Sequence, residues 1–397
     1  MEFVNKTFYT DKVSELNSFG SFLGNLQYLS LDAELKDKKG NILVQPKRPL
    51  TAQIVKALSS REDDNEFKFY LDNSKSFNEA LVARIVKEIN QHISLADFSY
   101  ASFLLDKQRI NTSRVATLAL GNDFFKGFIT MLLYEHKPIA NHLFEVALTS
   151  VGLMANLKPN TFSNGELAKI FIAGILHDYS ISQTVMWEEK DIFSSENPNQ
   201  HDVESASQVS NQKIDEDIPE IIKYNNHLRN NYQGVAKGGS WFNDPVELMS
   251  VIINIVEYYT YVRRDVMKRG GVEDPMSVVM YEISLEAEKG FFPKPLIGLF
   301  EGYFSKYAEF FKYGEGIGAV ENQCPHGPYA LAYPKPKSTQ VLCKNSEVPC
   351  PHRYSGKQLN VVRSENDMTG RYGEHLYPGW YDKCDFSEQL PAPPKNF

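Results

Sequence analysis

The stretch FIAGILHDYSISQ, from Phe171 to Gln183, ends an apolar run with an imidazole and a carboxylate side by side, His177 and Asp178. The apolar residues before this pair are typical of a buried helix. An unpaired charge is costly to bury, so the pair needs either water or a partner. We therefore interpret His177 and Asp178 as candidate ligands of a metal ion, and the rest of the chain can be searched for others.

Helical patterns surround this stretch, from about residue 113 to residue 313. Ser163-Asn-Gly-Glu166 has the form of a capping box and predicts a helix that ends near His177. Asp244-Pro-Val-Glu247 predicts the start of a second helix, VELMSVIINIVEYYTYVRR, with Pro245 in its first turn. The polar segments 187–200 and 230–240 are expected to be loops.

The two ends of the chain differ from this helical centre. Before it, apolar and polar residues alternate on both sides of Asp37-Lys-Lys-Gly40, which predicts a hairpin with Gly40 at positive φ. Helices are expected at about 51–59 and 76–93. After residue 314 the chain is rich in Pro, Gly, Tyr, Cys and His. We expect a mainly α fold in three parts: an α/β N-terminal domain (1–100), a helical domain (101–314) and a loop-rich extension (315–397).

Composition narrows the class of protein. The 397 residues are 42% hydrophobic and 23% charged, which is ordinary for a globular chain with a real core. The net charge of −8 argues against duplex nucleic acid and anionic membranes as partners. No apolar run reaches the roughly 18 residues of a membrane span, and the first residues lack the pattern of a secretory signal. We expect a cytoplasmic location.

Further candidate ligands occur along the helical region. Four histidines and one acid lie on, or at the edge of, predicted helices: His142, His177, His201, His227 and Glu257. Several helices can converge to point such side chains into one cavity. Imidazole with carboxylate suits Fe, Mn, Zn and similar divalent ions. Spacing alone is weak evidence, because a lone histidine is more often a core or surface residue than a ligand.

The order His, His-Asp, His, His and acid resembles the HD superfamily of metal-dependent phosphohydrolases. More narrowly, it is similar to the HD-GYP branch, whose members hydrolyse cyclic di-GMP and related cyclic dinucleotides. The resemblance runs from about His142 to Tyr303. It is carried by the stretches NHLFEVA, FIAGILHD, HDVESASQVS, NHLRNNYQGVAKG, VIINIVEYYTYVRR and GFFPKPLIGLFEGYF.

The resemblance implies an HD-type helical bundle with two divalent ions, Fe or Mn, and His177 and Asp178 at the catalytic centre. It implies that a metal-activated hydroxide attacks a phosphodiester. A second copy of the chain or a signalling protein is a further candidate partner. The implied first-metal ligands are His142, His177, Asp178 and Glu257, with Asp178 bridging; His201 and His227 would hold the second metal. The candidate substrate-binding cations are Arg229, Lys237, Arg263 and Arg264, for each of which a solvated helix-end cation is the alternative.

The chain also departs from the branch. Asn226 stands in place of the first of two paired histidines, Gly234-Val-Ala replaces Gly-Tyr-Pro, and the acid of the last helix is Glu257 instead of aspartate. Tyr179 occupies the position of a common lysine, and Pro138 that of a glutamate that holds a third metal. Two alternatives to the phosphodiesterase therefore stay open: a degenerate module that binds a nucleotide or a protein without turnover, and an HD nucleotidase acting on mononucleotides.

The four cysteines raise a separate question. Cys324-Pro-His326 and Cys350-Pro-His352 repeat one tripeptide, with Cys343 between them and Cys384 beyond. Thiols and imidazoles in a loop-rich tail suit a structural zinc site. The spacings are not those of a standard zinc finger, and small buried hydrophobic cysteines with incidental histidines are the alternative.

Overall fold

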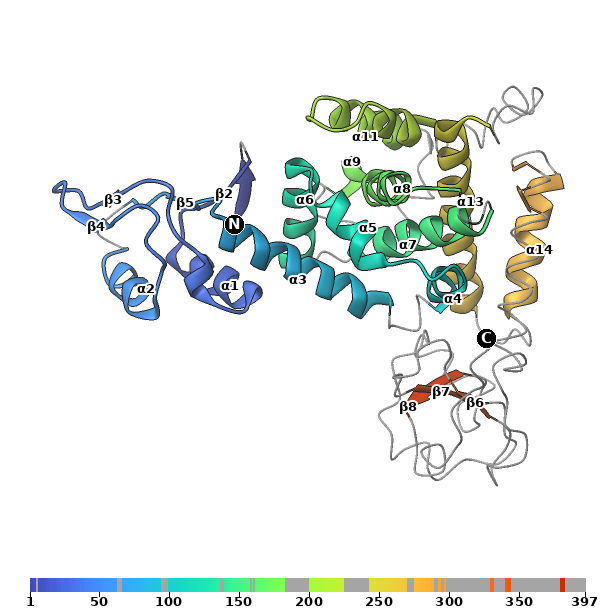
Figure 1. Cartoon of the computed structure of the whole chain (residues 1–397), viewed down its shortest axis with the longest axis horizontal. Helices are drawn as coiled ribbons and strands as arrows, with labels where there is room; N and C mark the ends of the chain where they lie inside the picture. Colours follow the sequence, from blue (N-terminus) through green and yellow to red (C-terminus); the bar gives the residue numbers. More distant parts are fainter. Residues whose placement is uncertain are drawn as a thin grey trace.

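The computed structural model shows a mainly helical protein in which a small α/β part precedes a larger helical part (Figure 1). It describes residues 1–4, 6–62, 66–93, 99–135, 139–157, 159, 161–182, 200–224, 243–269, 275–288, 292–293, 296–297, 329–331, 340–343 and 379–382. The predicted fold class is confirmed. Among the helices in these ranges, none combines the length and the apolar character that a membrane crossing requires.

The N-terminal part is built on a three-stranded antiparallel sheet. Its strands, in the order β1-β2-β5, are β1 (Glu2–Val4), β2 (Thr7–Thr10) and β5 (Phe69–Tyr70). The helices are α1 (Val13–Leu23), α2 (Ala52–Ser59) and α3 (Lys75–Ile93), and Phe8 of β2 packs against Phe19 and Phe77 at ring distances of 5.1 and 5.8 Å. The predicted hairpin is present as β3 (Leu35–Lys36) and β4 (Ile42–Val44), with Gly40 at a φ of 82°.

The helical part is arranged around one buried helix, α7 (Ile139–Leu157). From His142 to Asn156 every residue of α7 is buried, as expected of a helix with apolar residues on all sides. It packs against α4, α8 and α13. The described helices of this part are α4 (Ser99–Lys107), α5 (Thr112–Ala119), α6 (Asp123–Tyr134), α8 (Asn164–Leu176), α9 (Tyr179–Ser182), α11 (Gln200–Ser210), α13 (Pro245–Arg269) and α14 (Pro275–Glu288).

Both predicted helix starts are confirmed. The Ser163 hydroxyl accepts a hydrogen bond from the backbone of Glu166, whose carboxylate accepts one from the backbone of Ser163, and α8 ends at Leu176 with His177 as its C-cap. At α13 the Asp244 carboxylate accepts hydrogen bonds from the backbone of Val246 and Glu247. These local signals fix where the helices that carry the candidate ligands begin and end.

Helices α7 and α8 pack closely at Gly174. A Cβ atom built on Gly174 would lie 2.7 Å from the Cα of Ala147, so only glycine allows this contact without a backbone shift. His177 follows Gly174 by one turn, and His142 precedes Ala147 by just over one turn. The close packing therefore helps to set the 5.4 Å between the centroids of the two imidazole rings.

Replacing Gly174 by alanine is expected to separate α7 from α8 and to lower the free energy of unfolding by about 1–3 kcal/mol, the usual cost of overpacking. Urea denaturation measures the loss. Gly165→Ala, on the same helix, is the matched control, because its Cβ would meet only the Ser163 hydroxyl at 3.7 Å. Equal stability of the two variants would contradict the packing argument.

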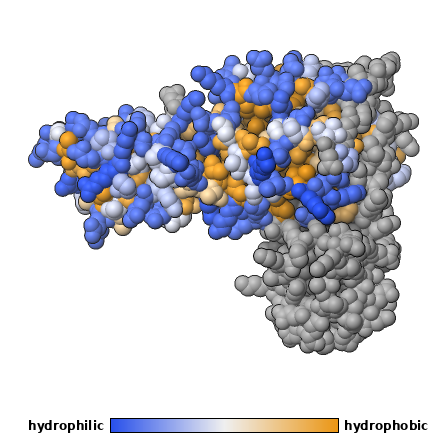
Figure 2. All heavy atoms as spheres, in the orientation of Figure 1, coloured by the Kyte–Doolittle hydropathy of each residue, from blue (hydrophilic) through white to orange (hydrophobic). Residues whose placement is uncertain are grey.

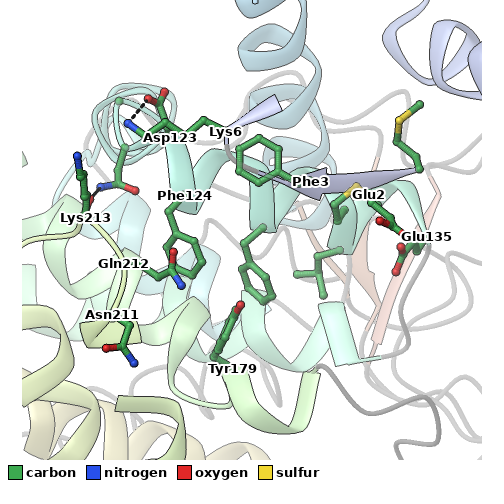
Figure 3. Close-up of a pocket in the computed structure, with 16 residues that line it drawn as sticks. Glu2, Phe3, Lys6, Asp123, Phe124, Glu135, Tyr179, Asn211, Gln212 and Lys213 are labelled. Atoms are coloured by element: carbon green, nitrogen blue, oxygen red, sulfur yellow. Dashed lines mark hydrogen bonds and ion pairs between the residues drawn. The ribbon is translucent and has the colours of Figure 1, made fainter. Parts of the chain in front are cut away.

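A pocket of about 890 Å³ lies where β1 meets α6 (Figure 3). Its aromatic lining includes Phe3, Phe124 and Tyr179, and the ring of Phe3 occupies the notch that Gly127 leaves on α6. Tyr179 directly follows Asp178 in sequence.

In the space-filling view, hydrophilic residues cover most of the visible N-terminal part, whereas apolar residues show on the central part (Figure 2).

The extension contains a small sheet that the sequence did not predict. Strands β6 (Tyr329–Leu331), β7 (Gln340–Cys343) and β8 (Gly379–Asp382) pair antiparallel in the order β6-β7-β8. Cys343 ends the middle strand. The other cysteines and the two histidines of the repeated tripeptide lie outside the described residues, so the tail zinc site stays a prediction.

Candidate metal centre

Five of the six predicted metal ligands come together inside the helical part. His142 lies on α7, His177 is the C-cap of α8 and Asp178 follows it. His201 is the second residue of α11, and Glu257 lies in the middle of α13. All five are buried, with exposed fractions of 9% for His201 and 3% or less for the others. Residues separated by more than a hundred positions therefore meet in one place.

Asp178 is at the centre of this group. Its Oδ2 lies 3.4 Å from Nε2 of His142 and 3.2 Å from Nε2 of His177, and its Oδ1 lies 3.4 Å from Nε2 of His201. The atoms form two overlapping sets, His142–His177–Asp178 and Asp178–His201–Glu257, in each of which the ligand atoms lie within 4.8 Å of one another. Asp178 belongs to both sets, as a bridging carboxylate must.

The residues present fit a divalent cation. Within the described part of the chain, no group hydrogen-bonds to either ring nitrogen of His142, to Nε2 of His177 or to either oxygen of Asp178. Buried polar atoms rarely stay unsatisfied. Two ligands bound at about 2.0–2.1 Å to one ion are themselves separated by about 3.0–3.4 Å. The separations around Asp178 therefore match the spacing around an ion.

The orientation of His177 supports the same conclusion. Its Nδ1 donates a hydrogen bond to the carbonyl oxygen of Gly174 at 2.8 Å. A carbonyl only accepts, so the proton is on Nδ1 and the lone pair of the neutral ring is on Nε2, which faces Asp178. Metal-binding histidines commonly have their second nitrogen held in this way.

The buried carboxylates of the centre favour bound positive charge. Burial by itself lowers the pKa of His177, but the charge of Asp178 outweighs burial and raises this pKa to about 9. Burial also lowers the pKa of His201, but the contact with Asp202 and the charge of Asp178 outweigh it and raise this pKa to about 10. Burial raises the pKa of Asp178, yet the charge of His177 and the contact with His142 hold it well below its usual range. Cations would replace the protons that these imidazoles attract.

A buried ion pair lies beside the centre. Glu145, one turn after His142 on α7, accepts a hydrogen bond from Arg263 at 2.7 Å and another from Arg264 at 3.0 Å. The side chains of Glu145 and Arg263 are 3% and 5% exposed, and that of Arg264 is 22% exposed. Both arginines were predicted to bind substrate. The structure places Arg263 in a structural pair between α7 and α13, whereas Arg264 remains partly accessible.

Asp202 is a buried acid of the site that sequence reasoning missed. It is 0% exposed, and its Oδ1 lies 3.1 Å from Nε2 of His201. The available signal was the second His-Asp dipeptide of the chain, in NQHDVESA. Burial is the largest cause that raises the pKa of Asp202, to about 6, against the opposing effect of His201.

The remaining predicted site residues lie outside the described residues. These are His227, Arg229 and Lys237, together with Asn226, Gly234 and Pro138 of the departures. The predicted loops at 187–200 and 230–240 also lie there, except for Gln200, which begins α11. None of the five clustered ligands lines the pocket between β1 and α6.

Comparison with known families gives the decisive match. Residues 139–260 match the family model of the HD domain, a range that contains every described ligand from His142 to Glu257. This segment is similar to the HD domain. The HD domain indicates metal-dependent phosphohydrolase chemistry and supports the resemblance at the level of the superfamily, but the match does not extend to the HD-GYP branch. Searches of curated proteins and of solved structures found no match to this chain.

Proposed function

We propose that the HD domain of this chain is a metal-dependent phosphodiesterase whose substrate is a cyclic dinucleotide, such as cyclic di-GMP. The observation that carries the proposal is the convergence of His142, His177, Asp178, His201 and Glu257 with Asp178 shared between two ligand sets. A carboxylate common to two sets suits a pair of ions. The substrate class rests on the sequence resemblance around Asn226 to Gly238.

The roles of the residues follow from their positions. His142, His177 and Asp178 would hold one cation, and Asp178, His201 and Glu257, with His227 from the sequence prediction, would hold the other, so Glu257 moves from the predicted first set to the second. When bound, two divalent cations activate water and offset negative charge on the phosphoryl oxygens. The apolar surroundings of α7 and α8 exclude bulk water, which strengthens every charge interaction in the centre.

The partly exposed Arg264 is the better candidate for a phosphate contact than Arg263. Its positive charge is felt in the centre, where it adds to burial in lowering the pKa of His142, against the opposing effect of Asp178. Arg263 is buried against Glu145 and would instead hold α13 in position. Arg229 and Lys237 complete the proposed set of substrate-binding cations.

The test is an assay of protein purified without chelator and loaded with Mn²⁺ or Fe²⁺. We expect hydrolysis of cyclic di-GMP or of cyclic GMP-AMP to linear products, resolved by chromatography, and complete loss of turnover in excess EDTA with recovery when Mn²⁺ is restored. Turnover of mononucleotides alone would identify the nucleotidase alternative instead.

Calorimetry separates the remaining alternative from the enzyme. A degenerate module, suggested by Asn226 and by the altered Gly234-Val-Ala, would bind a cyclic dinucleotide without forming product. If the metal-loaded protein neither binds nor hydrolyses any cyclic dinucleotide, the proposed substrate is wrong, whereas a failure to bind metal would remove the proposed enzyme altogether.

A further inference from the structure

Two serines connect the segment that carries Asp178 to the helix that carries His201. Ser180 is the second residue of α9 and follows Asp178 by two positions, and Ser205 lies on α11, four positions after His201. Ser205 is 0% exposed and Ser180 is half-buried. We call Ser180 and Ser205 the serine pair. Neither serine has a role in the ligand sets described so far.

The serine pair forms a complete set of hydrogen bonds with His201. The backbone N–H of Ser180 donates to Oγ of Ser205 at 3.0 Å, and the hydroxyl of Ser180 donates to the backbone carbonyl oxygen of His201 at 3.1 Å. The two hydroxyl oxygens are 3.0 Å apart. A hydroxyl has one proton and a carbonyl only accepts, so the proton between the two hydroxyls comes from Ser205. Each donor of the pair therefore has its own acceptor.

These hydrogen bonds join the backbones of two candidate ligands. At one end, α9 is attached to Asp178, because the backbone N–H of Ser182 donates to the carbonyl oxygen of Asp178 at 2.9 Å. At the other end, Ser180 holds the carbonyl of His201 itself. The serine pair thus fixes the start of α11 on α9, while Oδ1 of Asp178 and Nε2 of His201 are 3.4 Å apart.

The second ligand set is sensitive to this attachment. Asp178, His201 and Glu257 come from three different segments, so the set exists only while α11 is held in place. The 3.4 Å between Asp178 and His201 is already at the upper end of the about 3.0–3.4 Å that separates two ligands of one ion. Ligands must be held to within about 0.5 Å of their working geometry. The first set contains no residue of α11 and does not depend on the serine pair.

We propose that Ser180 and Ser205 are positioning residues for the second cation, because they hold His201 at ion-binding distance from Asp178. The inference rests on the two-cation centre of the proposed function and deepens it. It assigns the affinity of one of the two sites to a pair of neutral side chains that bind no metal themselves.

The first test is titration of the full-length Ser205→Ala protein with Mn²⁺, followed by calorimetry and by elemental analysis after gel filtration. We expect two binding steps in the unaltered chain. In the variant the second step should be about 10–100-fold weaker, the usual effect of losing a group that orients a ligand, and the first step should be unchanged.

Ser250→Ala is the matched control. Ser250 on α13 is also 0% exposed, and its hydroxyl donates to the carbonyl oxygen of Ile221 at 3.0 Å, so its loss removes a buried contact of the same kind. Helix α13 stays attached to α7 through Arg263 and Glu145. We therefore expect Ser250→Ala to lower stability and to leave both Mn²⁺ affinities unchanged.

Variants of Ser180 test the same inference independently of whether Ser205→Ala folds, because Ser180 is only half-buried. Ser180→Ala should weaken the second step, whereas Ser180→Thr, which keeps the hydroxyl, should bind Mn²⁺ as the unaltered chain does. Combining Ser180→Ala with Ser205→Ala should cost less than the sum of the two single losses, because both serines belong to one network.

Thermal unfolding provides a readout that does not depend on activity. In EDTA, Ser205→Ala and Ser250→Ala should both melt below the unaltered chain. Saturating Mn²⁺ should raise the melting temperature of Ser205→Ala by less than that of Ser250→Ala, because a weakened site stabilises less. Equal weakening of both Mn²⁺ steps, unchanged binding, or equal gains in the two variants would overturn the inference. A single binding step or none in the unaltered chain would contradict the two-cation centre itself, before any variant is made, and the inference with it.

Discussion

Asp178→Asn is expected to abolish metal binding at both ligand sets and to reduce turnover by about 10³-fold or more, equivalent to about 4 kcal/mol of transition-state stabilisation. Asp178 contacts His142, His177 and His201, so its loss removes the shared ligand of both sets. An amide of the same shape keeps the packing but supplies only a weak neutral oxygen. Elemental analysis and the chromatographic assay measure the two effects.

The same variant should leave the folded state intact. Without metal, Asp178→Asn removes a buried negative charge, and circular dichroism should show an unchanged helical spectrum. Asp11→Asn is the control, because Asp11 is an exposed carboxylate in the N-terminal part. Retention of two metal equivalents by the Asp178→Asn protein would show that the cluster around Asp178 is not the metal centre.

Glu145→Gln is expected to lower the free energy of unfolding by about 3–5 kcal/mol, the usual effect of removing one partner of a buried ion pair. Arg263, whose side chain is 5% exposed, would keep its charge without the carboxylate that compensates it. The pair joins α7 near His142 to α13 near Glu257. The affinity for Mn²⁺ should therefore fall as well, because the two ligand-bearing helices lose their connection.

An exposed ion pair is the matched control for this measurement. Lys75 and Glu79 lie 3.8 Å apart on α3, with side chains 90% and 67% exposed. Glu79→Gln should change the free energy of unfolding by no more than about 0.5 kcal/mol, since exposed helix pairs contribute little. Urea denaturation compares the two variants directly, and a Glu145→Gln loss as small as that of Glu79→Gln would refute the buried-pair argument.

Much of the local structure could be predicted because its causes lie within a few residues. The hairpin at Gly40, the capping box at Ser163 and the start of α13 at Pro245 all appear where the sequence predicts them. Each depends on hydrogen bonds or backbone angles inside one short segment. The residue types and order of the candidate ligands are also features of the sequence, and five of the six lie together in the structure.

Other features of the site could not be predicted, since they depend on contacts between distant segments. The close approach of Gly174 to Ala147 requires α7 and α8 to pack side by side, and neither residue signals it alone. The contact of Arg263 with Glu145, which lies 118 positions earlier, could not be predicted either. The short strands β6, β7 and β8 have little periodicity of their own and are defined by their pairing.

By itself, the sequence determined the helical class of the central region, the ends of its key helices and the list of residues able to hold a cation. Only the tertiary structure decided which of them share an ion-sized space, that Asp178 stands between two sets, and that Asp202 is buried beside them. The physical reason is the distance along the chain over which each interaction acts. Helix caps and periodicity act over a single turn, whereas the energy of a buried charge depends on every helix packed around it.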